Sequence, residues 1–225
     1  PYAPGPIILE IKNLSKYYSG KLILNCISLE LREGETLGLI GSSGSGKSTL
    51  AKCIIGLQSV AGGEIRYRGE PIENVNRFNR IRLAREIQYI FQDPFSSLSP
   101  RMSIGEALLE PMIVHKLYEN DKIRSKKIDE LLISVGLDSS VKEKYPHEFS
   151  GGQRQRIGIA RALVLEPKVL ICDESVSALD LSVQAQVLNL LNDLKEKFRF
   201  SYIFISHDAR VVKYMSNNIM DLEKI

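Results

Sequence analysis

Apolar and polar residues alternate with a period of two near the start of the chain, which is typical of half-buried β-strands. Residues 7–12 and 22–31 predict two such strands, and the polar segment 16–21 predicts a turn between them. Short apolar runs bounded by turn residues predict further, more deeply buried strands. These runs lie at residues 35–40, 64–69, 87–91, 168–172 and 202–205, and a last strand-like segment precedes Ile225.

A helical period of apolar residues replaces this alternation between residues 93 and 155. Its clearest stretch runs from Ile128 to Val135 at positions i, i+3, i+4 and i+7, and Gly136 then supplies a stop signal. Further helices are predicted at residues 50–57, from 157 onward and at 183–198. Strands and helices alternate outside the helical stretch, so the pattern predicts an α/β fold with a helical insertion.

Composition and charge restrict the class of protein only moderately. The 225 residues suffice for one large domain, and 44% hydrophobic with 25% charged residues is ordinary for a soluble globular chain. A net charge of +3 is mild and does not by itself favour a nucleic-acid partner. No apolar run approaches the length of a membrane span. Residues 1–6 lack the features of a signal peptide and are expected to be a linker.

Cysteine and histidine usage does not indicate a metal site. Cys26, Cys53 and Cys172 are widely spaced, and each lies in or beside an apolar stretch. We therefore expect three buried free thiols in a reducing compartment. His115 and His147 have no partner in sequence, and we expect both to be structural or to face solvent.

The strongest motif is the pattern G-x-x-x-x-G-K-[ST], which predicts a phosphate-binding P-loop. Its residues are Gly41, Ser42, Ser43, Gly44, Ser45, Gly46, Lys47, Ser48 and Thr49. Glycines allow a tight turn whose N–H groups converge on phosphate oxygens at a helix N-terminus. Lys47 adds a full positive charge for the β- and γ-phosphates, and the Ser48 hydroxyl suits Mg²⁺. The strand and helix predicted on either side disfavour the alternative of a flexible Gly/Ser-rich loop.

A second candidate phosphate site repeats this chemistry at the start of another predicted helix. Ser150, Gly151, Gly152 and Gln153 offer a hydroxyl, unobstructed N–H groups and a helix N-terminus. A chain with one ATP pocket does not need two such sites. We therefore expect the second site to face another molecule.

Candidate catalytic groups follow the predicted buried strands. Asp173 suits a Mg²⁺ position and Glu174 suits a general base that polarises water, although two adjacent acids can also be a charge pair at a helix N-terminus. His207 follows the strand 202–205 and can hydrogen-bond a phosphate. Gln92 closes the strand 87–91 and can reach a metal or an attacking water. Ligands in open α/β sheets bind beyond the carboxyl ends of strands, so these groups are expected on one side.

In this order, the motifs resemble the nucleotide-binding subunit of ABC transporters over nearly the whole chain after residue 6. The segment 149–153, Phe-Ser-Gly-Gly-Gln, is similar to the LSGGQ signature of that family, with Phe149 in place of the usual Leu. The resemblance implies a P-loop NTPase with a RecA-like core, an N-terminal antiparallel β subdomain and an inserted helical subdomain. It implies one ABC ATPase domain, 1–225, in which 7–92 and 157–225 form the β subdomain and core and 93–156 the helical signature subdomain.

The resemblance also implies a role for each motif. Residues 41–49 are Walker A, 169–173 are Walker B and 177–180 are the D-loop; Ser175 stands where the family usually has Pro. ATP and Mg²⁺ are the implied cofactors, and Ser48, Gln92 and Asp173 hold the metal. Lys47, Gln92, Glu174 and His207 are catalytic. Tyr18 stacks on the base, with Tyr17 as the alternative, and Ser150 to Gln153 complete the pocket of a second subunit.

A narrower likeness concerns importers of peptides and nickel. Residues 91–102, 145–156 and 177–186 are similar to the corresponding segments of that subfamily, whose members usually continue beyond the position of Ile225. The likeness implies membrane permease subunits, a second ABC ATPase subunit, identical or homologous, and an extracytoplasmic substrate-binding protein as partners. It implies a peripheral location on the cytoplasmic face of the cell membrane, without nucleic acid. The alternatives are a soluble ABC-type regulatory or assembly ATPase and the ATPase subunit of an exporter.

Overall fold

An antiparallel sheet forms one end of the protein in the computed structural model, which describes residues 5–73, 75–93 and 98–223. Its strand order is β2-β1-β4-β5, so the long β1–β2 hairpin lies at one side of the sheet. The strands are β1 (Ile7–Tyr18), β2 (Lys21–Arg32), β4 (Gly62–Tyr67) and β5 (Glu70–Pro71). The alternation in the sequence is confirmed, but β1 continues to Tyr18 and leaves only Ser19 and Gly20 for the turn.

A five-stranded sheet forms the centre of the molecule, and all its neighbouring strands run parallel. Its order is β6-β7-β8-β3-β9, so the strand before the P-loop lies between β8 and β9. The strands are β3 (Thr36–Ile40), β6 (Ile87–Ile90), β7 (Val169–Asp173), β8 (Ser201–Ile205) and β9 (Asn218–Asp221). Because the strands are parallel, their carboxyl ends meet at one edge of the sheet.

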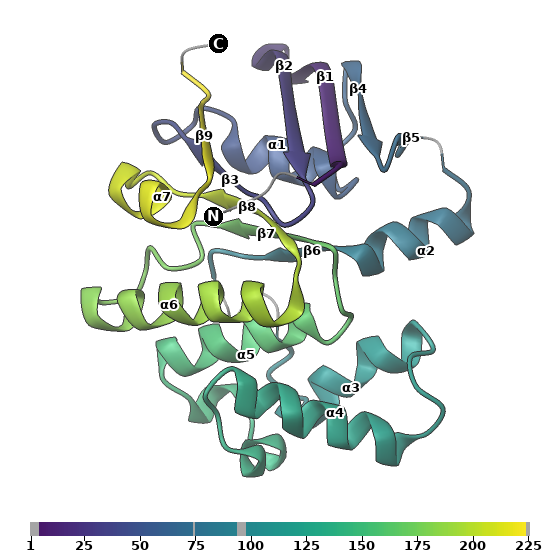
Figure 1. Ribbon diagram of the computed structural model, residues 1–225, viewed down its shortest axis with the longest axis vertical. Coiled ribbons are helices and arrows are strands. Elements are labelled where there is room, and N and C mark those ends of the chain that lie inside the picture. Colours follow the sequence, from purple (N-terminus) through teal and green to yellow (C-terminus); the bar gives the residue numbers. More distant parts are fainter. Residues whose placement is uncertain (1–4, 74, 94–97, 224–225) are drawn as a thin grey trace.

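Helices surround the parallel sheet and also form the predicted helical region (Figure 1). The α-helices are α1 (Lys47–Ile54), α2 (Arg77–Glu86), α3 (Ile104–Val114), α4 (Asp121–Ser134), α5 (Gly151–Leu163), α6 (Leu181–Phe198) and α7 (Ala209–Met215). Two 3₁₀ helices, η2 (Ser139–Glu143) and η3 (Pro146–Glu148), precede α5. The boundary predicted between residues 156 and 157 falls inside α5, which is one continuous helix. None of the helices in the described ranges has the length and apolarity needed to cross a bilayer.

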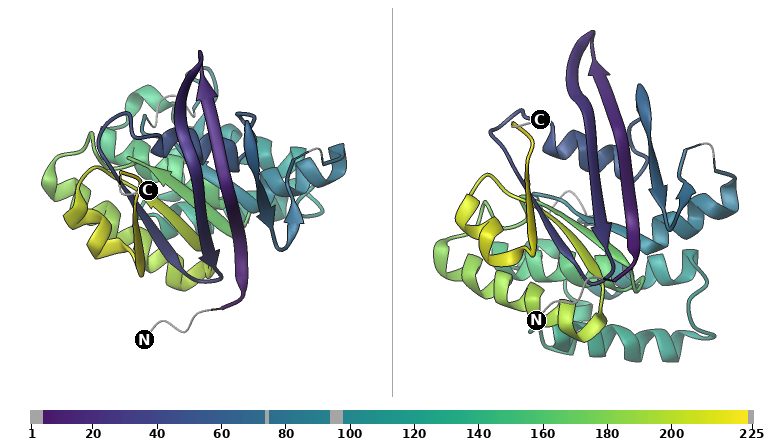
Figure 2. Two further views of the ribbon diagram at one scale, coloured as in Figure 1. Left: turned by 90° about the horizontal axis from the view of Figure 1, so that it is seen from above. Right: turned by 45° about the horizontal axis from the view of Figure 1, so that its top comes forward.

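Two hydrophobic cores lie on opposite faces of the parallel sheet. One face carries α1 and the antiparallel sheet, and the other carries α3, α4, α5 and α6 (Figures 1 and 2). Successive residues of a strand point to opposite faces. In β7, accordingly, Val169 and Ile171 belong to the first core, whereas Leu170 and Cys172 belong to the second.

The structure corrects the expectation for one of the three cysteines. Cys53 and Cys172 are buried free thiols as predicted, but Cys26 is exposed. It lies on β2 where the register with β1 shifts, in the left-handed region at φ 52°, and its N–H is bonded to the hydroxyl of Ser15. A bulge of this kind turns a residue away from the face that local sequence assigns to it. Helix α2 was not predicted, and residues 94–97 of the segment 91–102 lie outside the described residues.

Candidate functional site

The P-loop connects the carboxyl end of β3 to the N-terminus of α1. Gly46 is the N-cap of α1 in the left-handed region, at φ 95°, and no side chain caps the helix. A Cβ at this position would lie 2.7 Å from the Leu24 side chain and 3.1 Å from the Ile23 carbonyl oxygen. Only glycine therefore fits between the loop and β2. The first N–H groups of α1 remain without a side-chain acceptor, which is the arrangement that binds anions.

Lys47 lies in the interior of this loop and is only 5% exposed. Its ammonium group donates to the carbonyl oxygens of Gly41 and Ser42 at 2.7 and 2.8 Å. The positive charge is thus held on the concave side of the loop, surrounded by backbone that can also present N–H groups. Residues 42–44 are exposed, so an anion has access from solvent.

Three predicted catalytic residues meet beyond the strand ends. Nε2 of Gln92 donates to Oε2 of Glu174 at 3.4 Å, and Nδ1 of His207 lies 3.5 Å from the same oxygen. Glu174 itself is left-handed, at φ 46°, and its N–H donates to the carbonyl oxygen of Ile205 at 3.0 Å. This bond ties the residue after β7 to the end of β8. The structure therefore brings together groups that the sequence could only assign to separate strands.

Asp173 ends β7 and is 6% exposed, so both carboxylate oxygens need partners. Its Oδ2 accepts a hydrogen bond from the hydroxyl of Tyr89, whereas Oδ1 is buried and has no hydrogen-bond donor among the residues that the structure describes. An unpaired buried carboxylate oxygen is costly unless a cation meets it, so Asp173 fits the Mg²⁺ position predicted for it. Ser48, whose hydroxyl is a further predicted Mg²⁺ ligand, lies in the first turn of α1 and is partly buried.

The two candidate aromatic residues lie at the tip of the β1–β2 hairpin. Tyr17 is 53% exposed and Tyr18 is 64% exposed, and they pair with Leu22 and Lys21 of β2. Because adjacent residues of a strand point to opposite faces, only one of the two can stack on a base beside the P-loop. The assignment of this role to Tyr18 stays a prediction.

The second candidate phosphate site is the N-terminus of α5, and it differs from the P-loop in its capping. The hydroxyl of Ser150 accepts from the N–H of Gln153, and Oε1 of Gln153 accepts from the N–H of Ser150 at 3.1 Å. This is a capping box, which satisfies two N–H groups within the chain. Ser150, Gly151 and Gln153 are exposed. Buried residues of α5 and of α1 belong to different cores, on opposite faces of the parallel sheet.

Two contacts at the site were missed by the sequence analysis. The first is the bond from Tyr89 to Asp173; burial, followed by this bond, raises the pKa of Tyr89 well above its usual value, so the phenol stays a donor. The second joins Ser42 to Glu223, whose carboxylate accepts from the N–H of Ser42 at 2.6 Å. Hydrogen bonding by the side chain of Ser42, followed by that of its N–H, lowers the pKa of this carboxyl. Both join residues far apart in sequence, and no motif spacing indicates either one.

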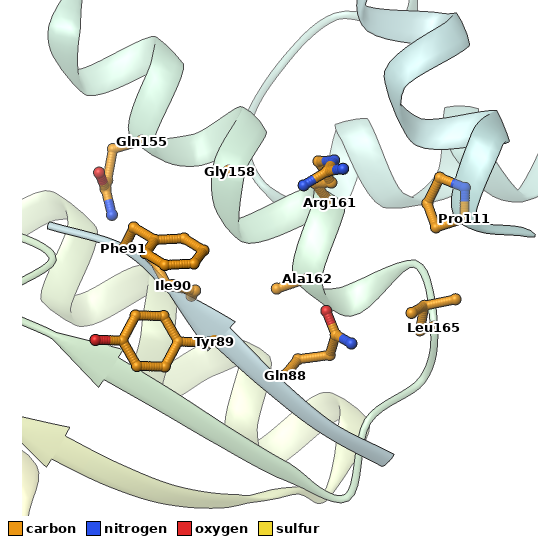
Figure 3. A pocket seen from close by; sticks show the side chains of 10 residues that line it. All are labelled: Gln88, Tyr89, Ile90, Phe91, Pro111, Gln155, Gly158, Arg161, Ala162 and Leu165. Carbon is orange, nitrogen blue, oxygen red and sulfur yellow. The ribbon is translucent and has the colours of Figure 1, made fainter. Parts of the chain in front are cut away.

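A pocket of about 160 Å³ lies beside β6, away from the P-loop. Figure 3 shows Gln88, Tyr89, Ile90 and Phe91 of β6 and the residue after it, together with side chains of α5 and Pro111 of α3. Gln155 is buried at its rim, and its Nε2 has no hydrogen-bond partner within the described residues. The pocket thus lies between the parallel sheet and the helical region, next to the strand that leads to Gln92.

The loop, its buried lysine and the carboxylates beyond the parallel strands together define a P-loop protein. Comparison with known proteins specifies the class further, because the profile of the ABC transporter family matches residues 24–177. This chain therefore belongs to the ABC transporter family.

Relatives and solved structures agree with this assignment. The oligopeptide transport ATP-binding protein OppF of Bacillus subtilis (strain 168) is 45% identical over 217 residues, which cover 94% of this chain and 71% of that protein. The di/tripeptide transport ATP-binding protein DppF of Pseudomonas aeruginosa (strain UCBPP-PA14) is 42% identical over 209 residues, which cover 93% of this chain and 64% of that protein. The chain spans about two thirds of the length of the curated relatives that it matches.

Two solved structures share the fold closely. One is cbiO1 from Clostridium perfringens, described as part of the ABC transporter complex cbiONQ, with a TM-score of 0.86 and 29% identity over 96% of this chain and 84% of that one. The other is the ATP-binding cassette MJ0796, solved as a dimer in a post-hydrolysis state with ADP and Pi. Its TM-score is 0.84, and it is 28% identical over 95% of this chain and 94% of that one. The expected α/β P-loop fold with an antiparallel β sheet is confirmed.

Proposed function

We propose that this chain is the ATP-binding and ATP-hydrolysing subunit of an ABC importer for peptides. The observation that carries the proposal is the convergence of Gln92, Glu174 and His207 beside a P-loop whose lysine is already held in place. Relatives 42–45% identical to the chain are named as oligopeptide or di/tripeptide transport proteins, which favours peptides over nickel as the cargo.

Each residue of the site has a distinct task in this proposal. Lys47 and the free N–H groups at the start of α1 bind and orient the β- and γ-phosphates. Ser48, Gln92 and Asp173 would hold Mg²⁺, and this ion would neutralise charge that develops on the phosphate oxygens. Glu174 accepts a proton from, or polarises, the attacking water, and His207 donates to the γ-phosphate.

The exposed N-terminus of α5 supports a dimer as the working unit. α5 packs on the face of the parallel sheet opposite to α1. The N–H groups of Gly151 and Gly152 lie outside the capping box, and Ser150 and Gln153 are exposed. We infer that they complete the ATP site of a second ABC ATPase subunit, as the dimeric structures of MJ0796 suggest. ATP binding then favours the closed pair, and hydrolysis releases it.

Membrane partners follow from the same proposal. The pocket between β6 and α5 offers the permease subunits a contact next to Gln92, so that movement at the site can be transmitted to them. The subunit would then lie peripherally on the cytoplasmic face of the cell membrane and serve an extracytoplasmic binding protein indirectly. The alternative, a soluble ABC-type regulatory ATPase, requires that the native protein does not sediment with membranes, which tests it directly.

The central experiment compares Glu174→Gln with wild type. We expect ATP binding to persist and turnover to fall by about 10²–10³-fold, since one electrostatic group at the reacting centre is commonly worth that much. Calorimetry measures binding, and phosphate release measures turnover. Light scattering with and without Mg²⁺-ATP then shows whether the variant dimerises with itself or needs a different partner.

Two further variants make the result specific. Lys47→Ala should weaken ATP binding by roughly 10–100-fold, the value of a hydrogen bond to a charged group. Glu130→Gln removes an exposed glutamate on α4 and should leave turnover unchanged. Wild-type turnover in Glu174→Gln would exclude Glu174 as the base, and an unchanged ATP affinity in Lys47→Ala would contradict the P-loop assignment.

A further inference from the structure

Tyr89 reaches the carboxylate of Asp173 from the neighbouring strand. β6 and β7 run parallel, and Tyr89 is paired with Ile171, two residues before Asp173. Residues i and i+2 of a strand lie on the same face and about 6.6 Å apart, which is close to the reach of a tyrosine side chain. The register of this one strand pair therefore places the phenol beside the carboxylate, and its hydroxyl donates to Oδ2.

The tyrosine ring is held in its own place by packing. Its centroid lies 4.5 Å from that of Phe91, with the two rings tilted by 53° (Figure 3). Tyr89 also packs against the core that contains Ile171 and Ile205. A ring fixed on both sides cannot follow the carboxylate if the carboxylate turns. The hydroxyl is thus a fixed donor, and Asp173 must orient itself toward it.

This bond makes the two oxygens of Asp173 unequal. Oδ2 accepts from the hydroxyl of Tyr89, whereas Oδ1 is buried and no group in the described part of the chain donates to it. Without the bond, the carboxylate could rotate about its Cβ–Cγ axis and offer either oxygen to any nearby group. Partners of this kind, which hydrogen-bond to a metal ligand from behind, orient the ligand and strengthen the metal site.

We propose that Tyr89 is a positioning residue that fixes the Asp173 carboxylate so that Oδ1 stays available to a divalent cation. The proposal deepens the function proposed above and rests on it, because the cation is the one that accompanies ATP. The proposal thus gives a role to β6, the strand before Gln92. Gln92 follows Tyr89 by three residues, and its side chain contacts Glu174 in the same site. β6 and the two residues that follow it would thereby supply both a group that orients the metal ligand and a group that contacts Glu174.

Tyr89→Phe tests the inference because it removes only the hydroxyl. Tyr67→Phe is the matched control, since the buried Tyr67 donates in the same way to Glu86 at 2.7 Å but lies on β4, outside the site. The affinity for Mn²⁺ in the presence of ATP is measured by electron paramagnetic resonance. ATP affinity in EDTA is measured by calorimetry, and thermal unfolding is recorded for each variant.

We expect Tyr89→Phe to weaken Mn²⁺ binding by roughly 10-fold, the lower end of the effect of removing a group behind a metal ligand. Tyr67→Phe should leave Mn²⁺ affinity unchanged, although both variants lose one buried hydrogen bond and should unfold at similarly reduced temperatures. ATP affinity in EDTA should equal that of wild type in both. Tyr89→Met, which fills the same space without a hydroxyl, should reproduce the loss seen in Tyr89→Phe.

Unchanged Mn²⁺ affinity in Tyr89→Phe, with ATP still bound, overturns the positioning role and leaves the proposed function intact. A loss in Tyr89→Met but none in Tyr89→Phe also overturns it, because packing and not the hydroxyl would then matter. Wild-type protein that binds no ATP, with or without the cation, overturns the proposed function and this inference together. The two failures are therefore distinguishable in a single series.

Discussion

The N-termini of α1 and α5 contain the same residue types but present them differently. α1 starts at a glycine in the left-handed region without a side-chain cap, and its loop closes around a buried lysine. α5 starts at Ser150, whose capping box satisfies two N–H groups internally, and its first residues are exposed. Glycine and serine at a helix start thus do not define one kind of site. The first arrangement holds a phosphate within the chain, whereas the second presents a surface to another molecule.

The comparison is tested most strongly at Gly46. Gly46→Ala should lower the free energy of unfolding by roughly 2–5 kcal/mol, because it combines left-handed strain with crowding against Leu24 and the Ile23 carbonyl. Gly44→Ala is the control, since Gly44 is also left-handed, at φ 86°, but has no heavy atom within 4 Å of the added Cβ. It should cost only about 1–2 kcal/mol. Equal losses in urea unfolding would show that crowding against β2 does not distinguish the two positions.

The two glycines of the second site should differ in how alanine changes stability. A Cβ on Gly152 would lie 2.6 Å from Cγ1 of Val183 on α6, whereas one on Gly151 would have its nearest neighbour at an ordinary 3.8 Å. Gly152→Ala should therefore destabilise by about 0.5–2 kcal/mol, since crowding exceeds the gain in helix propensity. Gly151→Ala should be neutral or slightly stabilising. Equal stability of the two variants in thermal and urea unfolding would contradict the close packing of α5 on α6 at Gly152.

Ser150→Ala separates the capping role from the role at an interface. Loss of the cap should cost about 1 kcal/mol of stability. Ser103→Ala is the matched control, because Ser103 and Glu106 form the same capping box at the start of α3. Both variants should unfold alike, but in the Glu174→Gln background only Ser150→Ala should lose dimerisation with Mg²⁺-ATP, as measured by light scattering. If Ser150→Ala still dimerises, Ser150 acts only as a helix cap and has no role at the interface.

The sequence predicted the parts of the site that depend on local residue types. The loop 41–49 is recognisable because glycines, lysine and serine must occur in a fixed order between a strand and a helix. Asp173 is recognisable because it directly follows a run of buried apolar residues, and His207 because it comes one residue after another such run. Their proximity was predictable in outline, since carboxyl ends of parallel strands share one edge.

Features that depend on register or on exposure could not be predicted in this way. Tyr89 and Asp173 are 84 positions apart, and only the pairing of β6 with β7 brings them together. Helix α2 has no buried residue, so it carries no apolar stripe that the pattern of the sequence could reveal. Cys26 has apolar neighbours, but a shift in the β1–β2 register places it on the exposed side.

The alternation of side chains along β7 and β8 has a consequence for how the molecule unfolds. Both strands contribute to each of the two cores, with Tyr202 and Phe204 on one side and Ile203 and Ile205 on the other. Neither core can open without exposing one face of the strands that the other core needs. The antiparallel sheet and the helical region should therefore melt in one cooperative transition, and the amides of β7 and β8 should exchange with solvent last of all.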